Sequence, residues 1–221
     1  MSVDVTAATQ QQAPLDGLLS LRVRSLTAGI NRLITFGSRE NPILGYRPVL
    51  QYTILAHTRP ALIDSYVQDG TSATTNFGTA TTAAVKLDTV NYNREAFFQF
   101  DVSGLATASS VKIVLIPTAV LADAATTTLS YEIASTDTWT ETGIIWNNKP
   151  GSTSTITTVT GYAVGQPVVI DVTSQANSKA SGNGLISVRV RSTTSGLNRM
   201  ITFGTSENSN VAYCPYLEYT P

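Results

Sequence analysis

The sequence predicts an all-β protein built as an antiparallel β-sandwich of the jelly-roll type. Apolar and polar residues alternate with a period of two along much of the chain, and no segment keeps a 3.6-residue period over the length of a helix. Turn-forming sequences separate the alternating segments, as at Asn76-Phe77-Gly78 and Lys149-Pro150-Gly151. Many short strands with such spacing are typical of sandwiches and jelly rolls.

The individual strands are predicted from the same alternation. In segment 185–192, Val188 and Val190 face one side while Arg189 and Arg191 face the other. Segment 94–102 is strand-like and carries a continuous patch of three phenylalanines. In chain order, the predicted strands are 19–24, 94–102, 111–116, 129–133, 168–172 and 185–192.

The chain carries its closing segment twice. Val3–Thr53 aligns without a gap with Ile170–Thr220, and about half of the aligned positions are identical. A fixed repeat marks a duplicated structural unit. We therefore expect a partial module over residues 1–53, a short connector over 54–63 that contains Pro60, and a complete module over 64–221.

The partial module is a surplus closing segment with an apolar face of its own. A contiguous exposed apolar face is unusual in a monomer, and unpaired strand edges need partners. The surplus could belong to a preceding module, pack on its own complete module, or complete a neighbouring chain as a donated strand. The residues expected to make this assembly contact are Leu19, Leu21, Val23, Ile34 and Phe36.

Composition narrows the classes of function. Charged residues make up 13% of the chain and the net charge is −1, without a basic run, which argues against binding to nucleic acid. The low charge also weakens the repulsion between copies of the chain. No stretch approaches the length of a membrane span, and the first residues contain no apolar signal-type run. We expect an extracellular or cell-surface protein without membrane insertion, whose signal sequence is not in this chain.

Several segments of the complete module together carry a resemblance to a known family. They are Asp64-Ser65-Tyr66-Val67-Gln68-Asp69-Gly70, Arg94-Glu95-Ala96-Phe97-Phe98-Gln99-Phe100-Asp101-Val102-Ser103, Thr138-Trp139-Thr140-Glu141, Ile145-Trp146-Asn147-Asn148-Lys149-Pro150 and Asp171-Val172-Thr173. In this order they resemble the DNRLRE-type carbohydrate-binding modules. The resemblance implies a jelly-roll fold and, in some settings, binding of acidic or neutral polysaccharides; other members resemble spacers or surface-layer modules.

No set of residues predicts catalysis. His57 is the only histidine and lies in the connector, and Asp137 and Glu141 are interpreted as turn residues beside Trp139 rather than as an acid–base pair. We therefore expect no enzyme and no required cofactor.

The sequence predicts no bound metal, with calcium as a possibility. Three aspartates near turns, Asp64, Asp69 and Asp101, are weak candidates for calcium ligands. Turn capping by the same side chains is the alternative.

Ligand binding is predicted weakly at four residues. Arg189 and Arg191 project from one face, with Arg199 expected on a neighbouring strand, and could bind the carboxylates of acidic sugars. The alternative is a solvated charge ladder facing Glu207 or Glu218. Trp139 could provide an aromatic platform for a sugar or could belong to the core.

Two functions are consistent with these observations. The repeat and the low charge favour a non-catalytic structural protein whose copies assemble by strand complementation into a fibre or surface array. The alternative is a carbohydrate-binding module attached to a polysaccharide-degrading enzyme or an adhesin. The partners would be other copies of the chain in the first case and polysaccharide in the second.

Overall fold

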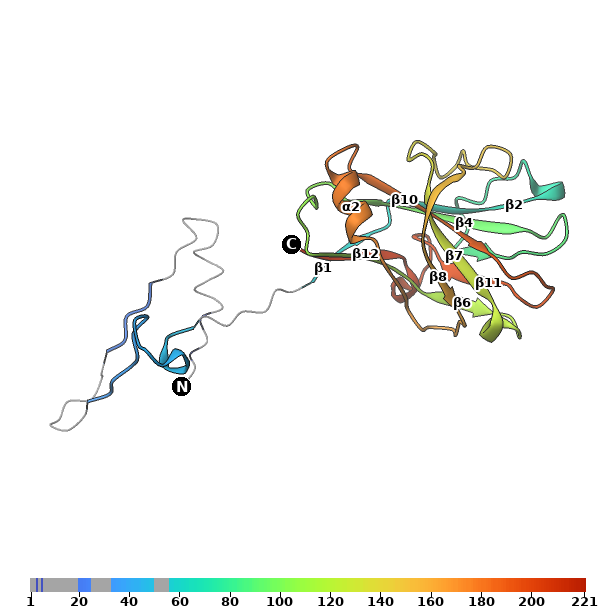
Figure 1. The fold of residues 1–221 in the computed structure, drawn as a ribbon. Coiled ribbons are helices and arrows are strands. Elements are labelled where there is room, and N and C mark those ends of the chain that lie inside the picture. Colours follow the sequence, from blue (N-terminus) through green and yellow to red (C-terminus); the bar gives the residue numbers. More distant parts are fainter. Residues whose placement is uncertain (1–2, 4, 6–19, 25–32, 50–55) are drawn as a thin grey trace. The chain divides into compact units, whose positions relative to one another are not determined.

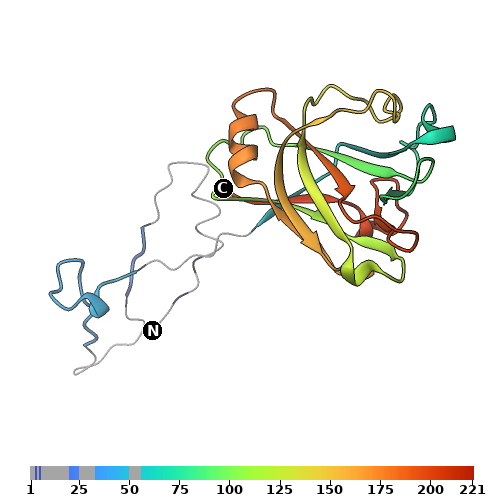
Figure 2. The same ribbon diagram turned by 45° about the vertical axis from the view of Figure 1, so that its right-hand side comes forward.

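The structure is a computed structural model that describes residues 3, 5, 20–24, 33–49 and 56–221. The chain divides into two compact units, Met1–Tyr52 and Thr53–Pro221, and each is described by itself. The second unit is a β-sandwich (Figures 1 and 2), which confirms the predicted all-β class.

Short strands make up most of the second unit, which we call the module. They are β1 (His57–Pro60), β2 (Ile63–Gln68), β3 (Thr82–Val85), β4 (Arg94–Asp101), β5 (Ser110–Leu115), β6 (Pro117–Val120), β7 (Thr128–Ala134), β8 (Ser152–Thr160), β9 (Val168–Asp171), β10 (Leu185–Ser192), β11 (Ile201–Gly204) and β12 (Tyr216–Thr220). The 3₁₀ turns of the module are η2 (Gly70–Ser72), η3 (Ala124–Thr126) and η4 (Val211–Tyr213), and its helix is α2 (Thr173–Ala180).

The strands form three antiparallel sheets. A five-stranded sheet has the order β2-β4-β10-β7-β8, and it faces a four-stranded sheet, β1-β12-β5-β9, and a three-stranded sheet, β3-β11-β6. The core lies between these layers. Phe98 on β4, for example, meets Phe203 on β11 edge to face, with ring centroids 6.5 Å apart.

The pleat of β4 divides the aromatic patch that looks continuous in the sequence. Phe98 and Phe100 point into the main core, whereas Phe97 points to the opposite face and packs with Trp139 in a second apolar cluster. Neighbouring residues of a strand face opposite sides, so a run of aromatics in one strand must serve two environments. The module therefore has an apolar patch on the outer face of its five-stranded sheet.

Several elements differ from the sequence prediction, among them the helix and a strand within the predicted connector. The helix α2 was not expected, because a helix of 8 residues with one buried residue, Ala176, is too short to produce a recognisable period. Part of the predicted connector also belongs to the sandwich, because His57–Pro60 forms β1 and pairs with β12. Among the described residues, no helix is long and apolar enough to span a membrane.

The described part of the first unit repeats one local structure of the module. The 3₁₀ turn η1 (Leu44–Tyr46) occupies the position in the repeat that η4 occupies in the module. In both copies an asparagine side chain, Asn41 or Asn208, accepts a hydrogen bond of 2.9 Å from the backbone N–H two residues later. The turn is thus formed by local sequence.

The strands are not repeated in the same way. Within 20–24 and 33–49, no strand is formed, and the side chains of Val23 and Phe36 are 75% and 56% exposed. Their counterparts in the repeat, Val190 on β10 and Phe203 on β11, are fully buried. Leu21 and Ile34 are likewise exposed, and Leu19 lies outside the described residues.

Candidate functional site

The outer face of the five-stranded sheet is half covered by the loop between β7 and β8. This loop, residues 135–151, places Trp139 and Ile144 on Val67 of β2 and Phe97 of β4. The indole N–H of Trp139 donates to Ser187 Oγ at 3.0 Å. Trp139 is only 9% exposed, so its ring is not available as a platform for a sugar, and the core interpretation of this residue describes the structure better.

The other half of this face carries an ion network centred on β10. Arg189 donates through Nε and Nη2 to both carboxylate oxygens of Glu95, each at 2.7 Å. Arg191 donates through Nε to Glu132 Oε1 at 2.7 Å, and Lys149 lies 2.7 Å from Glu95 Oε1. The partners expected for the arginines from the sequence, Glu207 and Glu218, are not those that the structure provides, because cross-strand register places Glu95 and Glu132 beside β10.

Hydrogen bonds hold the carboxylate of Glu132 in its charged form against the effect of burial. Burial alone would raise the pKa of Glu132, but hydrogen bonds from Ser152, Arg191 and Ser130 outweigh it and lower the pKa. Burial lowers the pKa of Lys149, whose ammonium group lies 3.1 Å from the centroid of the Trp146 ring. The network contains three cationic and two anionic side chains, and the charge of Asp69 also acts on Lys149.

Arg191 is the member of the network that faces solvent. Its side chain is 41% exposed, and within the described part of the chain it donates only through Nε, so both Nη groups are available to a ligand. Register places Ser130 of β7 beside Arg191 and pairs Ser130 with the exposed Thr158 of β8. We call the solvent-facing residues Arg191, Thr155 and Thr158, together with the buried Glu132 and Ser130 that pair with them, the open strip.

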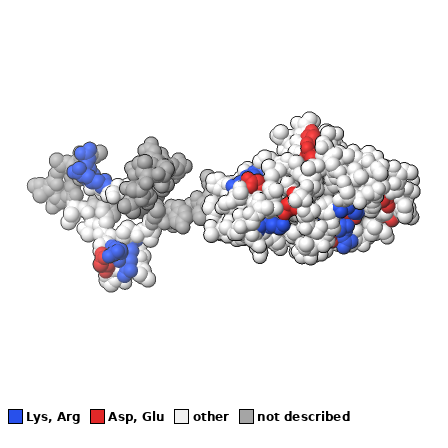
Figure 3. All heavy atoms as spheres, turned by 90° about the horizontal axis from the view of Figure 1, so that it is seen from above, with Lys and Arg blue, Asp and Glu red and all other residues white. Residues whose placement is uncertain are grey.

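Arg199 does not belong to this face. It lies in the loop between β10 and β11 and donates through Nη1 to Thr126 Oγ1 at 2.7 Å. The prediction that it occupies a neighbouring strand is wrong, because the chain leaves the sheet after Ser192. On the module face seen in Figure 3, Lys and Arg alternate with Asp and Glu, without a large patch of one sign.

A groove lies on the opposite side of the sandwich, on the outer face of β1 and β12. Its volume is about 520 Å³, and its lining includes Pro60, Val211, Cys214 and Tyr216 with the polar residues Ser206 and Glu218. Tyr216 offers an aromatic side chain there. The groove is a second place where a ligand could be held.

The three calcium candidates have different environments. Asp69 accepts hydrogen bonds from the backbone and side chain of Asn93, and Asp101 accepts from Ser103 N–H and lies 3.5 Å from Arg59. Both therefore cap turns, as the alternative interpretation holds. Asp64 instead lies close to Glu141 and Glu207.

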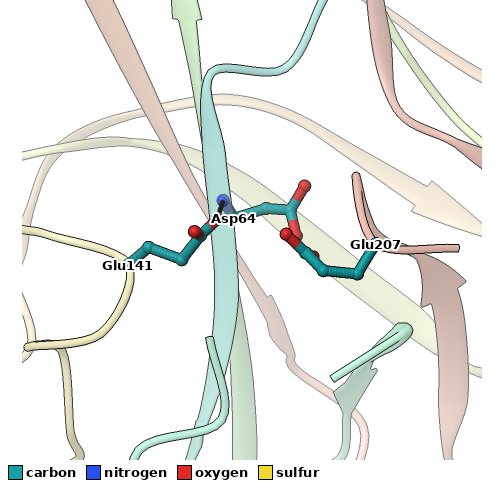
Figure 4. Close-up of side chains that lie close together, drawn as sticks. All are labelled: Asp64, Glu141 and Glu207. Atoms are coloured by element: carbon teal, nitrogen blue, oxygen red, sulfur yellow. Dashed lines mark hydrogen bonds between the residues drawn. The ribbon is translucent and has the colours of Figure 1, made fainter. Parts of the chain in front are cut away.

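Asp64, Glu141 and Glu207 form a carboxylate cluster. Figure 4 shows Glu141, from the 135–151 loop, and Glu207, from the turn after β11, both reaching toward Asp64 on β2. One oxygen of each side chain lies within 4.8 Å of the other two. Asp137, which the sequence places near Glu141, is instead paired with Lys179 at 2.6 Å. Sequence reasoning did not find this cluster, because its members are far apart in the chain and no spacing links them.

The cluster shifts the titration of its buried member. Burial raises the pKa of Asp64 from 3.8 to about 7; the N–H of Ser206 opposes this effect and the charge of Glu207 adds to it. The folded state therefore holds a proton on Asp64 more tightly than the unfolded chain does. The contribution of this proton to the free energy of unfolding is fully present below pH 3.8 and is lost as the pH rises through about 7.

We expect this pH-dependent loss of stability to be measurable by urea unfolding in a buffer that contains a chelator. The free energy of unfolding should fall between pH 4 and pH 7 by more in the wild type than in Asp64→Asn, whose side chain does not titrate. Asp123→Asn, at an exposed aspartate, should leave the wild-type pH profile unchanged. If the free energy of unfolding depended on pH in the same way in the wild type and in Asp64→Asn, this would contradict the raised pKa of Asp64.

Fold and surface together define a β-sandwich binding module, with polar and charged side chains presented on the face of a sheet. Residues 56–220 match the family description "Carbohydrate-binding module family 96". Since the match covers most of the chain, the chain belongs to this family, which confirms the resemblance to carbohydrate-binding modules noted in the sequence. Families of this kind are binding modules rather than catalysts, in agreement with the prediction that the chain is not an enzyme. A comparison with curated proteins found no match.

Proposed function

We propose that the module binds acidic polysaccharide through the open strip, in an extracellular or cell-surface protein. The observation that carries the proposal is the solvent-facing guanidinium of Arg191, held by Glu132 but with both Nη groups unengaged among the described residues. Membership of carbohydrate-binding module family 96 supports the class of ligand. This is the alternative function from the sequence, and it now has the stronger support.

The chemistry of the strip suits a carboxylate-bearing sugar. A guanidinium binds a carboxylate through parallel hydrogen bonds, and Glu132 fixes its orientation before a ligand arrives. The hydroxyls of Thr155 and Thr158, which are both exposed, can each donate to or accept from sugar hydroxyls. The hydroxyl of Ser130 is buried and donates to Glu132 Oε1 at 2.9 Å. The solvent-facing guanidinium of Arg191 favours an anionic chain over a neutral one.

The test is binding of the full chain to polygalacturonate and to a neutral glucan, measured by isothermal titration calorimetry. We expect Arg191→Ala to weaken binding to polygalacturonate about tenfold or more, which is typical of a central arginine contact. Arg191→Lys, which retains the charge but loses the fork, should weaken it less. Added salt should weaken binding in the wild type, because the contact is between charges.

Arg199→Ala is the matched control, since this arginine lies away from the strip. It should bind as the wild type does. Unchanged affinity in Arg191→Ala together with a loss in Tyr216→Ala would place the ligand in the groove instead. Equal binding to the neutral glucan would contradict the preference for acidic chains.

Self-assembly remains a second candidate because of one specific observation. The same repeated sequence is buried as β10 and β11 in the module but leaves Val23, Phe36, Leu21 and Ile34 exposed in the first unit. Exposed apolar residues of this size favour burial against a partner. A second β-sandwich that lacks its own closing segment would be such a partner, because this segment could supply its missing strands.

Deletion of residues 1–52 tests this second candidate. If the first unit mediates assembly, the full chain should form species of higher mass at high concentration, and the deleted chain should be a folded monomer by light scattering. A full chain that stays monomeric at high concentration would rule out self-assembly.

A further inference from the structure

The carboxylate cluster joins three parts of the module that are distant in sequence. Asp64 lies on β2 at the edge of the five-stranded sheet, Glu141 lies in the loop that covers that sheet, and Glu207 lies in the turn that follows β11 of the three-stranded sheet. No Lys, Arg or His within the described residues forms an ion pair with any of the three. No cationic side chain among the described residues therefore offsets the charge of these carboxylates.

Each carboxylate has one oxygen held by the protein and one that is not. Asp64 Oδ2 accepts from Ser206 N–H at 2.8 Å, Glu207 Oε1 from Ser206 Oγ at 3.0 Å, and Glu141 Oε1 from Asp64 N–H at 3.1 Å. The remaining oxygens of Asp64 and Glu207, Oδ1 and Oε2, are buried and have no hydrogen-bond partner among the residues that the structure describes. The remaining oxygen of Glu141 also accepts no hydrogen bond from the described residues.

Buried carboxylate oxygens without partners are costly, and Asp64 has no exposed surface at all. Hydrogen bonds to the outer oxygens of metal-binding carboxylates are a regular means of orienting the inner ones. The pattern of one fixed and one free oxygen on three converging carboxylates is thus the pattern expected of ligands that surround a cation.

We propose that Asp64, Glu141 and Glu207 bind one calcium ion. Oxygen ligands of a single Ca²⁺ lie about 2.3–2.6 Å from it and are therefore separated by at most about 5 Å, which agrees with the limit of 4.8 Å observed in the cluster. An all-oxygen, anionic ligand set favours calcium over zinc, which prefers nitrogen and sulfur. Calcium also tolerates irregular geometry, whereas magnesium requires a near-ideal octahedron.

A bound ion would link the 135–151 loop, through Glu141, to Asp64 of the five-stranded sheet and to Glu207 beside the three-stranded sheet. The loop carries Trp139, which packs on the outer face of the five-stranded sheet, so the ion would stabilise the arrangement of that face. Without the ion, like charges from three segments oppose one another.

The experiment uses the full chain, stripped of metal with EDTA, dialysed and titrated with calcium chloride at neutral pH. We expect one saturable site by isothermal titration calorimetry and a melting temperature that rises with calcium concentration, since a ligand that binds only the folded state stabilises it. Magnesium chloride should bind more weakly. Glu141→Gln and Glu207→Gln should each weaken calcium binding at least about tenfold, and Asp64→Asn should abolish it.

Asp123→Asn controls for the loss of a carboxylate elsewhere and should retain the site. Circular dichroism of each variant separates loss of the site from loss of the fold, and the two glutamate variants suffice if Asp64→Asn does not fold. The absence of saturable calcium binding by the wild type would overturn the proposal. So would calcium binding that persists unchanged in both Glu141→Gln and Glu207→Gln.

Discussion

Replacing Phe203 with alanine is expected to lower the free energy of unfolding of the module by about 3–5 kcal/mol. Phe203 is fully buried on β11 and contacts Phe98 and Tyr162 edge to face, so its removal leaves a cavity between the two layers of the sandwich. The loss should appear in urea unfolding followed by tryptophan fluorescence.

The repeat supplies the matched control for this experiment. Phe36 stands at the same position in the first copy and is 56% exposed, so Phe36→Ala should leave the unfolding of the module within about 0.5 kcal/mol of the wild type. A loss in Phe36→Ala as large as in Phe203→Ala would show that the first copy contributes to the stability of the module. A small loss in Phe203→Ala would contradict its place in the core.

Replacing Glu132 with alanine should also lower the free energy of unfolding, by about 3–5 kcal/mol, because one partner of a buried ion network is removed. The Glu132 side chain is 2% exposed and lies between Arg191 at 2.7 Å and Arg189 at 3.5 Å. Its loss would leave three cations with only Glu95 to compensate them. The measurement is the same urea unfolding at neutral pH.

A glutamate on the other side of the sandwich is the control for the Glu132 experiment. Glu218 lies on the outer face of β12 opposite Lys112 and Thr58, and it forms no ion pair within the described residues. Glu218→Ala should therefore change the free energy of unfolding by no more than about 0.5 kcal/mol. A loss below about 1 kcal/mol in Glu132→Ala would mean that Glu95 alone compensates the cations.

The class of fold could be predicted because strand alternation is a local signal. The strands around residues 94–102, 111–116, 129–133, 168–172 and 185–192 all appear in the structure as β4, β5, β7, β9 and β10. Strand β8 was not recognised, since its run of Ser and Thr has little apolar alternation and it lies at a sheet edge with mostly exposed residues. Edge strands depend on a neighbour's backbone more than on a buried face of their own.

The candidate site was predicted in part. Alternation along β10 placed Arg189 and Arg191 together on one face, as the structure does. Their carboxylate partners depend on cross-strand register, and the burial of Trp139 depends on how the 135–151 loop packs, which no local pattern reveals. The prediction for Arg199 was wrong because it placed this residue on a strand, whereas it lies in the loop between β10 and β11.

The sequence by itself determined the alternation of the strands, the duplication and the 3₁₀ turn that both copies form. That turn needs only neighbouring residues, so η1 and η4 share the same two backbone hydrogen bonds in different surroundings, although η4 alone has a side-chain cap, from Asn210. Tertiary structure decided everything that requires distant partners. The repeated segment becomes the central strand β10 only where β4 and β7 flank it, because a strand satisfies its backbone hydrogen bonds through its neighbours. In the same way, Asp64, Glu141 and Glu207 become a cluster only when three segments of the folded module converge.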